Sequence, residues 1–346
     1  MKTEVLQIKS PEENAKELVK AAAVLKRGGL VVFPTETVYG IGGVATSADA
    51  VSAIYEAKGR PSDNPLIVHI ARPVDAEQYA VTNDTYYRLA AAFMPGPLTI
   101  ILPKKDTVPD AVTGGLSTVA LRVPAHPVAA ALIRTVGAGI AAPSANLSGR
   151  PSPTTATHVI EDLSGRVDMI IDGGECEVGL ESTIVALDGD VATLLRPGAI
   201  TADALACVCR EVRIAPAVTQ LLGRDERPLS PGMKYRHYAP RATLTLLDGA
   251  DGDVTAYLKS LTADSAVGIL CYDEEADLLQ GAAALFPIGS KHDLQAQAKR
   301  LFAALREADS HPACQRLFAH LPQQTGLGLA LYNRLIRAAA HTIKKV

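Results

Sequence analysis

The sequence has no tryptophan and few other aromatic residues, which together make up 4% of its 346 residues. Hydrophobic residues nevertheless account for 48% of the chain and charged residues for 21%, so it can bury a full core built mainly from Ala, Val, Leu and Ile. This composition excludes a disordered chain. The length favours two domains over one.

The chain also has no large net charge, no long apolar run and no C-x-x-C pair of cysteines. The net charge of -3 argues against a protein that coats nucleic acid, so no stable DNA binding is expected. No stretch of 18 apolar residues exists and the N-terminus has no apolar signal core, which predicts a cytoplasmic protein without a membrane partner. Five cysteines without a C-x-x-C pair indicate neither a disulfide framework nor a zinc knot.

Several signature motifs of well-known enzyme classes are absent. There is no G-x-x-x-x-G-K-[ST], and Gly40-Ile-Gly42-Gly43 and Gly326-Leu-Gly328 are too short for a dinucleotide fingerprint. No H-E-x-x-H, EF-hand loop or G-x-S-x-G is present, which excludes metalloprotease and α/β-hydrolase chemistry. We expect no resident metal site.

The first part of the chain predicts a mixed sheet with helices. Ser10-Pro11-Glu-Glu13 forms a capping box with proline at the first helical position and predicts a helix that ends at Gly28-Gly29. Asp188-Gly189-Asp190 lies between two apolar runs and predicts a hairpin, so part of the sheet is antiparallel. The expected strands are Leu30–Phe33, Pro65–Ile70, Leu98–Leu102, Val119–Val123, Thr183–Leu187 and Val191–Leu195, and further helices are expected at 47–57 and 127–135. We therefore predict an α+β domain with a twisted mixed sheet over residues 1–213.

Residues 214–240 break this pattern. They carry four prolines, and two tyrosines, a histidine and two cations fall within Lys234–Tyr238, which is typical of a functional loop rather than a spacer. Beyond them, strands expected at 243–247, 266–272 and 284–288 and helices at 293–308 and 326–341 predict a smaller, open α/β sheet domain over residues 241–346.

Polar residues gather on turns beside the short apolar runs of the first domain. Planar arginine forks bind oxyanions bidentately, and glycines let backbone N–H groups approach them, so these turns predict one dispersed site for a triphosphate or a carboxylate. The segments are Lys58-Gly-Arg60-Pro-Ser62-Asp-Asn64, Ser117-Thr118-Val-Ala-Leu-Arg122, Pro143-Ser144-Ala-Asn146-Leu-Ser148-Gly149, Glu181-Ser182-Thr183 and Arg196-Pro197-Gly198. Each segment alone is also compatible with turn formation or a surface cation. His69 alone is equally compatible with a half-buried structural histidine.

Together with Pro34-Thr35-Glu36-Thr37-Val-Tyr39-Gly40, these motifs closely resemble the threonylcarbamoyl-AMP synthase family, whose catalytic part is a YrdC-type domain. Ser230-Pro-Gly-Met-Lys-Tyr-Arg-His-Tyr-Ala-Pro240 and Gly326-Leu-Gly-Leu-Ala-Leu-Tyr-Asn-Arg-Leu-Ile-Arg-Ala-Ala339 resemble the long form of the family. The resemblance therefore covers essentially the whole chain. It implies an α+β YrdC-like domain followed by a linker and a smaller α/β domain.

The resemblance implies a nucleotidyltransferase that joins L-threonine, bicarbonate and ATP into threonylcarbamoyl-AMP and pyrophosphate. The product would feed N6-threonylcarbamoyladenosine (t6A) formation in tRNA through a downstream threonylcarbamoyl transferase machinery. Mg2+ bound with ATP is expected by analogy with other phosphoryl chemistry. No enzyme nucleophile is required, because a carbamate oxygen attacks the α-phosphorus and the protein aligns and neutralises the anions.

The resemblance also assigns roles to individual residues. The residues expected to hold threonine are Thr37, His69, Arg122 and Ser182. Those expected to contact ATP are Lys58, Arg60, Asn64, Thr118, Ser144, Ser152 and Arg196, with Asn146 supporting the phosphates; the catalytic set is Lys58, Arg60, Ser144 and Asn146. Tyr235 is expected to close over the nucleotide, as part of a lid formed by Ser230–Pro240.

Two other functions compete with this interpretation. An RNA-binding module would need a basic, aromatic-interleaved stripe, whereas the cations here lie beside hydroxyl-rich turns. Carbamoyl-adenylate formation in hydrogenase maturation uses related domains, but those proteins carry zinc-finger and acylphosphatase-like parts that this chain lacks. The sequence of residues 241–346 shows no catalytic constellation.

Overall fold

The computed structural model describes residues 2–220 and 237–346, which form two compact units. Within these residues, the first unit comprises 2–148, 152–177 and 181–220, and the second comprises 149–151, 178–180 and 237–346. Tyr235 and most of the expected lid lie outside the described residues. The expected domain boundaries at 213 and 240 stay predictions.

The first unit is built on a mixed sheet. Its described strands are β1 (Glu4–Gln7), β2 (Val31–Phe33), β3 (Gly40–Val44), β4 (Ile67–His69), β5 (Leu98–Pro103), β6 (Thr118–Arg122), β7 (Ile140–Ala142), β8 (Met169–Asp172), β9 (Thr183–Asp188), β10 (Val191–Arg196) and β11 (Glu211–Ile214). They are hydrogen-bonded in the order β1-β8-β2-β3-β7-β4-β6-β5-β9-β10-β11. β4 runs parallel to β6, whereas β5 pairs with β6 and β9 with β10 in antiparallel fashion. The predicted α+β mixed sheet is confirmed.

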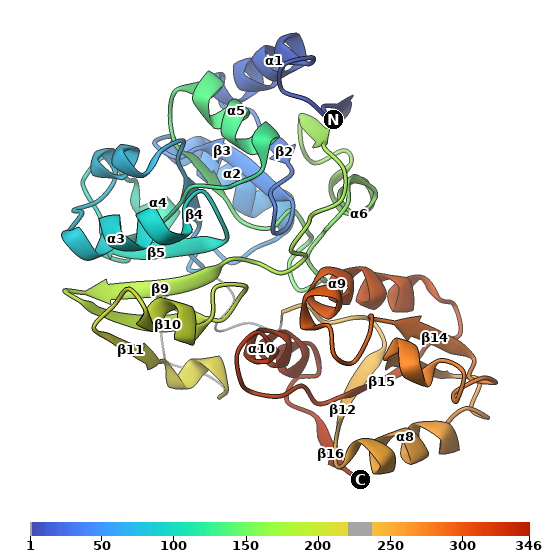
Figure 1. Cartoon of the computed structure of the whole chain (residues 1–346). Coiled ribbons are helices and arrows are strands. Elements are labelled where there is room, and N and C mark those ends of the chain that lie inside the picture. The colour runs from blue at the N-terminus through green and yellow to red at the C-terminus, as the bar shows by residue number, and fades with distance from the viewer. Residues whose placement is uncertain (1, 221–236) are drawn as a thin grey trace. The chain divides into compact units, whose positions relative to one another are not determined.

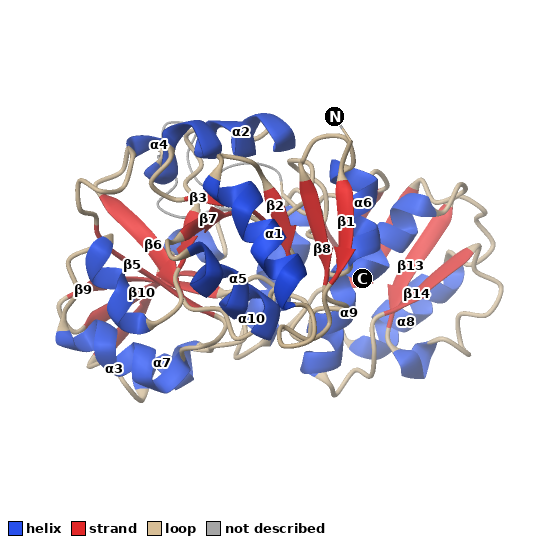
Figure 2. Ribbon diagram, turned by 90° about the horizontal axis from the view of Figure 1, so that it is seen from above, coloured by secondary structure: helices blue, strands red, loops and turns tan. Residues whose placement is uncertain are grey.

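Helices of the first unit cover this sheet (Figure 1). They are α1 (Ala15–Lys26), α2 (Ala48–Lys58), α3 (Asp84–Phe93), α4 (Asp110–Thr113), α5 (Pro127–Val136), α6 (Ala156–Leu163) and α7 (Ala202–Ala206), with short 3-10 turns η1 (Pro73–Gln78) and η2 (Pro216–Val218). α1 and α5 lie side by side and share one apolar core with strands β2 and β8 (Figures 1 and 2). Among the described residues, no helix combines the length and hydrophobicity needed to cross a membrane.

The ends of α2 show why one predicted helix position is accurate. The Ser47 hydroxyl accepts a hydrogen bond from the Ala50 N–H at 3.2 Å, and Gly59 ends the helix in the left-handed conformation (φ 59°). Lys58 is therefore the last residue of the helix, and Arg60 follows directly in the next turn.

One predicted helix start is wrong. The helix expected from the Ser10 capping box begins only at Ala15, because residues 11–14 form a turn. The Ser10 hydroxyl contacts the Glu12 carboxylate at 3.1 Å, and its distance to the Glu13 backbone nitrogen is a long 3.4 Å. A serine engaged with a neighbouring side chain caps the helix poorly.

The second unit is an α/β domain with an open sheet, as predicted. Its strands are β12 (Thr243–Asp248), β13 (Val267–Cys271), β14 (Ala284–Pro287), β15 (Arg316–His320) and β16 (Ile343–Lys345), and its helices are α8 (Asp251–Ser260), α9 (Leu294–Ser310) and α10 (Gly328–Ala338), with the 3-10 turn η3 (Asp273–Glu275). The strands are all parallel, in the order β14-β13-β15-β12-β16.

The helices of this unit cover both faces of its sheet. On one face, Val254 and Leu258 of α8 pack with Ile269 and Phe318. Successive side chains of a strand point to opposite faces of the sheet. Leu270, which follows Ile269, therefore faces the other side of the sheet, where α9 and α10 lie (Figures 1 and 2).

Candidate active site

Arg122 lies at the end of β6 and is the centre of a buried polar cluster. Its guanidinium donates from Nε to the Gly96 carbonyl at 3.2 Å, from Nη1 to the Thr37 hydroxyl at 2.9 Å and from Nη2 to a Glu36 carboxylate oxygen at 2.6 Å. Arg122 is 3% exposed and Glu36 5%, so this is a buried ion pair. An arginine has five N–H donors; three are used here, and no described residue bonds the other two, which can serve a ligand.

The turn that carries Glu36 and Thr37 is folded by its own side chains. Thr35 donates to the Val38 carbonyl at 2.6 Å, accepts from the Val38 N–H at 3.2 Å and bonds the Thr37 hydroxyl at 2.8 Å. The second carboxylate oxygen of Glu36 accepts the Ala125 N–H at 3.1 Å. Both carboxylate oxygens are therefore satisfied, and the turn is fixed against β6.

His69 stands beside Arg122, because the two residues are register partners in the parallel pair β4 and β6. Its ring meets Phe33 edge-on, with 6.0 Å between ring centroids. Burial, and then the positive charge of Arg122, lower the pKa of His69 to about 3, so the imidazole is neutral at physiological pH. Its Nδ1 is buried and has no hydrogen-bond partner among the described residues. Such an orphaned atom marks a place for a ligand group.

Lys58 holds the Pro143–Asn146 turn. Its ammonium donates to the backbone carbonyls of Ser144, at 2.5 Å, and Asn146, and it lies 3.5 Å from Oδ1 of Asn146. The Ser144 hydroxyl donates to the same Oδ1 at 2.6 Å. Lys58 is 2% exposed. The buried ammonium thus binds backbone carbonyls of the turn and fixes its conformation.

Ser182 and Arg196 form a second buried pair. Arg196 donates from Nε to the Ser182 carbonyl at 3.0 Å and from Nη2 to its hydroxyl at 3.1 Å, and that hydroxyl also bonds Thr99 at 2.7 Å. Gly198 is required beside them, because a Cβ there would lie 2.6 Å from the backbone nitrogen of Thr183. Ser152 donates to the buried Glu181 carboxylate at 2.5 Å.

Arg60, Asn64 and Thr118 lie toward the beginning of β4 and β6. Arg60 donates to the carbonyls of Asn64 at 3.3 Å and Pro65 at 3.1 Å, and Oδ1 of Asn64 is buried without a partner among the described residues. Thr118 begins β6, four residues before Arg122, which is about 13 Å along a strand. The structure therefore does not bring Thr118 into contact with the Arg122 cluster.

Two candidate functional residues were not predicted from the sequence. Glu36 and Glu181 stand inside quoted motifs but received no role, and the structure shows them as the buried acceptors that hold Arg122 and Ser152. Glu36 could have been predicted from the sequence, because an arginine in a buried site needs a nearby carboxylate as its counter-charge.

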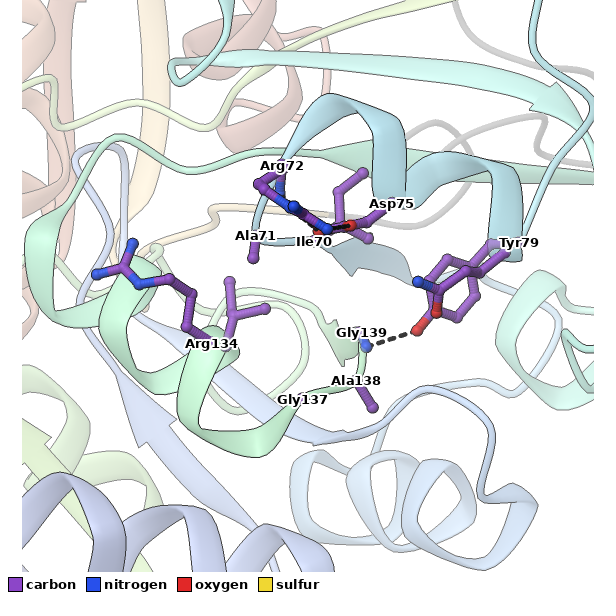
Figure 3. A pocket seen from close by; sticks show the side chains of 11 residues that line it. Ile70, Ala71, Arg72, Asp75, Tyr79, Arg134, Gly137, Ala138 and Gly139 are labelled. Carbon is purple, nitrogen blue, oxygen red and sulfur yellow. Dashed lines mark hydrogen bonds and ion pairs between the residues drawn. The ribbon is translucent and has the colours of Figure 1, made fainter.

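A separate cavity of about 350 Å3 contains none of the predicted site residues (Figure 3). Arg72 and Asp75 form an ion pair at 2.7 Å on its wall, and the Tyr79 hydroxyl accepts the Gly139 N–H at 2.6 Å. These polar groups satisfy one another, and we assign the cavity no part in the site.

The buried ion pair yields a stability prediction. Glu36→Gln removes the counter-charge of Arg122, and breaking a buried pair costs about 3–5 kcal/mol. As a matched control, Glu4→Gln breaks the exposed pair with Lys20 and should cost less than about 1 kcal/mol. Urea denaturation of both variants tests this; equal losses would show that burial does not govern the Arg122 pair.

His69 yields a prediction for the dependence of stability on pH. Its pKa is about 3 in the folded state and near 6.5 when unfolded, so the stability it contributes is complete above pH 6.5 and is lost as pH falls toward 3. Below pH 6, parent stability should fall more steeply than that of His69→Gln, by about 1.4 kcal/mol per pH unit.

Urea denaturation from pH 8.5 to 5 measures this difference. The two slopes should coincide above pH 7.5, where His69 is deprotonated in both states, which serves as the internal control. Identical slopes below pH 6, or a His69 ring that titrates near 6.5 by NMR, would contradict the buried neutral imidazole.

Comparison with known proteins identifies the family of the chain. Residues 23–198 match the Sua5, YciO and YrdC family model described as telomere recombination, and residues 200–340 match the model of the threonylcarbamoyl-AMP synthase C-terminal domain. The chain is 44% identical to the threonylcarbamoyl-AMP synthases of Bacillus subtilis, over 94% of both chains, and of Pyrococcus abyssi, over 94% of this chain and 95% of that one. The crystal structure of P. abyssi Sua5 complexed with L-threonine matches with a TM-score of 0.90 and 41% identity, over 100% of both chains. The chain therefore belongs to the threonylcarbamoyl-AMP synthase family.

Proposed function

We propose that this chain converts L-threonine, bicarbonate and ATP into threonylcarbamoyl-AMP and pyrophosphate. The single observation that carries the proposal is the Arg122 cluster. It combines a buried guanidinium, two of whose N–H donors bond no residue that the structure describes, with a neutral neighbouring imidazole whose Nδ1 has no partner among those residues. A small zwitterion with a hydroxyl group, such as threonine, satisfies both.

In the proposed complex, Arg122 binds the threonine carboxylate and His69 bonds a polar group of the amino acid. Thr37 and Ser182 supply hydroxyls at the border of this pocket. Because the imidazole is neutral, it does not add a second positive charge beside Arg122. Glu36 takes the supporting role of holding the guanidinium in place.

The proposed nucleotide contacts come from the turns around the pocket. Arg60, Asn64, Thr118, Ser144, Ser152 and Arg196 are the proposed ATP-binding residues. Arg196 bonds Ser182 directly, which joins the proposed threonine and nucleotide residues into one network. Lys58 and Asn146 act by shaping the Ser144 turn, since the Lys58 ammonium donates to backbone carbonyls of that turn and the Ser144 hydroxyl donates to Oδ1 of Asn146.

The chemistry requires alignment rather than a covalent enzyme intermediate. The amine of threonine and bicarbonate condense to a carbamate with loss of water. A carbamate oxygen then attacks the α-phosphorus of ATP, and the bond to the β-phosphate bridging oxygen breaks to release pyrophosphate. Positioning reactants in this way supplies up to about 7–11 kcal/mol of a barrier, and fixed cationic donors stabilise the developing charge.

We propose that Mg2+ enters with ATP and is held by its phosphate oxygens. Within residues 2–220 and 237–346, no group of three or more His, Cys, Asp or Glu side chains could hold a metal ion. The donor set around Arg122 and Ser144, which is rich in N–H and hydroxyl groups, suits phosphate and carboxylate oxygens better than a cation.

We further propose a cytoplasmic role in which the product is passed to a transferase that forms t6A in tRNA. A mixed anhydride of this kind hydrolyses readily, so a consuming enzyme must act soon after release.

The reaction itself is the first test of this proposal. Pyrophosphate should appear only when threonine, bicarbonate, ATP and Mg2+ are all present, because the attacking oxygen does not exist until the carbamate forms. A coupled pyrophosphate assay with each component omitted in turn measures this. Undiminished release without threonine, or ADP as the product, would contradict the proposal.

A matched pair of substitutions tests the division of labour. Arg60→Lys and Arg122→Lys each keep the charge and remove the planar fork. Arg122→Lys should weaken threonine binding about tenfold or more, since a charge-assisted hydrogen bond is worth about 1.5–3 kcal/mol, and Arg60→Lys should weaken ATP instead. Calorimetric titration of each variant with each ligand separates the two effects. Normal threonine binding by Arg122→Lys would overturn the carboxylate assignment.

A further inference from the structure

The second unit contains a cavity of about 420 Å3 that the proposed reaction does not use. It lies at the carboxyl ends of β12, β13 and β15, whose positions Figures 1 and 2 show. Asp248, Tyr272 and His320 line it where these strands end, and Lys291, His292 and Gln297 line it from the start of α9.

This position is where open parallel sheets bind ligands. The chain leaves β12 through α8 on one face of the sheet, whereas it leaves the adjacent β15 through α10 on the other. Ligands of such sheets occupy the crevice outside the carboxyl ends of strands whose connections diverge in this way. The volume also falls within the range of small-molecule sites.

Two buried side chains, Gln297 and His320, present polar atoms without a described partner to the cavity, and Oε1 of Gln297 is an acceptor. Gln297 is 3% exposed, and its Nε2 donates to the carbonyls of Ser290 at 2.8 Å and Lys291 at 3.1 Å. No described residue bonds its Oε1. His320 is 8% exposed, and its Nε2 bonds the Glu275 carboxylate at 2.8 Å. A carboxylate only accepts, so Nε2 donates this hydrogen bond, and no described residue bonds Nδ1.

Glu275 holds His320 and Tyr272 in place through hydrogen bonds. Its carboxylate also accepts the Thr255 hydroxyl at 2.7 Å and the Tyr272 N–H at 3.1 Å. The Tyr272 ring lies against the His320 ring, with 4.8 Å between centroids. Burial, and then the nearby carboxylates of Glu275, Asp251 and Glu274, raise the pKa of Tyr272 to about 12.

Asp248 gives the cavity a carboxylate that no described side chain pairs with. Asp251 and Lys291 form an ion pair and cancel each other. Asp248 forms no ion pair with any described residue, including its cross-strand neighbour Lys345. A ligand with positive charge and hydrogen-bond donors therefore matches the cavity, whereas phosphates and carboxylates are repelled. A metal ion does not fit, because no three ligating side chains meet among the described residues.

We propose that this cavity binds a small organic cation carrying primary ammonium groups. One ammonium lies against Asp248 and donates a further hydrogen bond to Oε1 of Gln297, beside the His320 ring. The inference goes beyond the proposed reaction and does not depend on it, because none of these residues belongs to the proposed threonine or ATP contacts.

The test uses the full chain and three probes of equal carbon length, without ATP or threonine. The probes are 1,4-diaminobutane, 1,4-butanediol and succinate, titrated by calorimetry. We expect saturable binding of one diamine per chain, no binding of the diol or of succinate, and diamine binding at least tenfold weaker in Asp248→Asn. Asp253→Asn, an exposed aspartate of α8 outside the cavity, should bind as the parent does.

A second measurement locates the probe independently of any substitution. The ring 15N signals of His320 should shift on addition of the diamine and stay unchanged with succinate. Absence of saturable diamine binding, equal weakening by Asp253→Asn, or His320 signals that do not respond would each overturn the proposal. A failure here leaves the proposed synthase reaction untouched, and a failed pyrophosphate assay leaves this site untouched.

Discussion

The buried ion pair between Arg122 and Glu36 is the constraint on which the site of the first unit depends. A guanidinium withdrawn from water is tolerated only when a carboxylate and further acceptors surround it. Arg122 therefore ties three segments together: the turn after β2 through Glu36, the end of β6 on which Arg122 lies, and the Gly96 carbonyl, which accepts from its Nε. His69 takes its neutral state from the same environment, since burial and the nearby positive charge both disfavour its protonation.

Other polar side chains of the candidate site are likewise held in place by hydrogen bonds to buried neighbours. Lys58 organises the Ser144 turn, Arg196 fixes Ser182, and Glu181 receives Ser152. Reorganising such groups during a reaction would cost free energy, so a site that is already ordered can stabilise charge as it develops. This arrangement suits a reaction between two anions that requires no nucleophile from the protein.

Elements with strong local sequence signals could be predicted from the sequence. Elements whose conformation depends on pairing with residues far along the chain could not. The Asp188-Gly189-Asp190 turn and the cap at Ser47 specify β9–β10 and α2 by themselves. The glycine-rich strand Gly40–Val44 and the three-residue strand Ile140–Ala142 were not predicted, because only pairing with remote strands makes them extended. Motifs located Arg122 and Thr37, but the Glu36 partnership spans 86 positions, and the inward direction of Lys58 depends on a turn 86 residues away.

The most direct test of this account is a crystal structure of the chain with L-threonine. We expect the threonine carboxylate to accept hydrogen bonds from the two remaining N–H groups of Arg122, with the Arg122–Glu36 pair intact. We also expect a threonine atom within hydrogen-bond distance of Nδ1 of His69. Threonine bound elsewhere, or bound through displacement of Glu36 from Arg122, would contradict it.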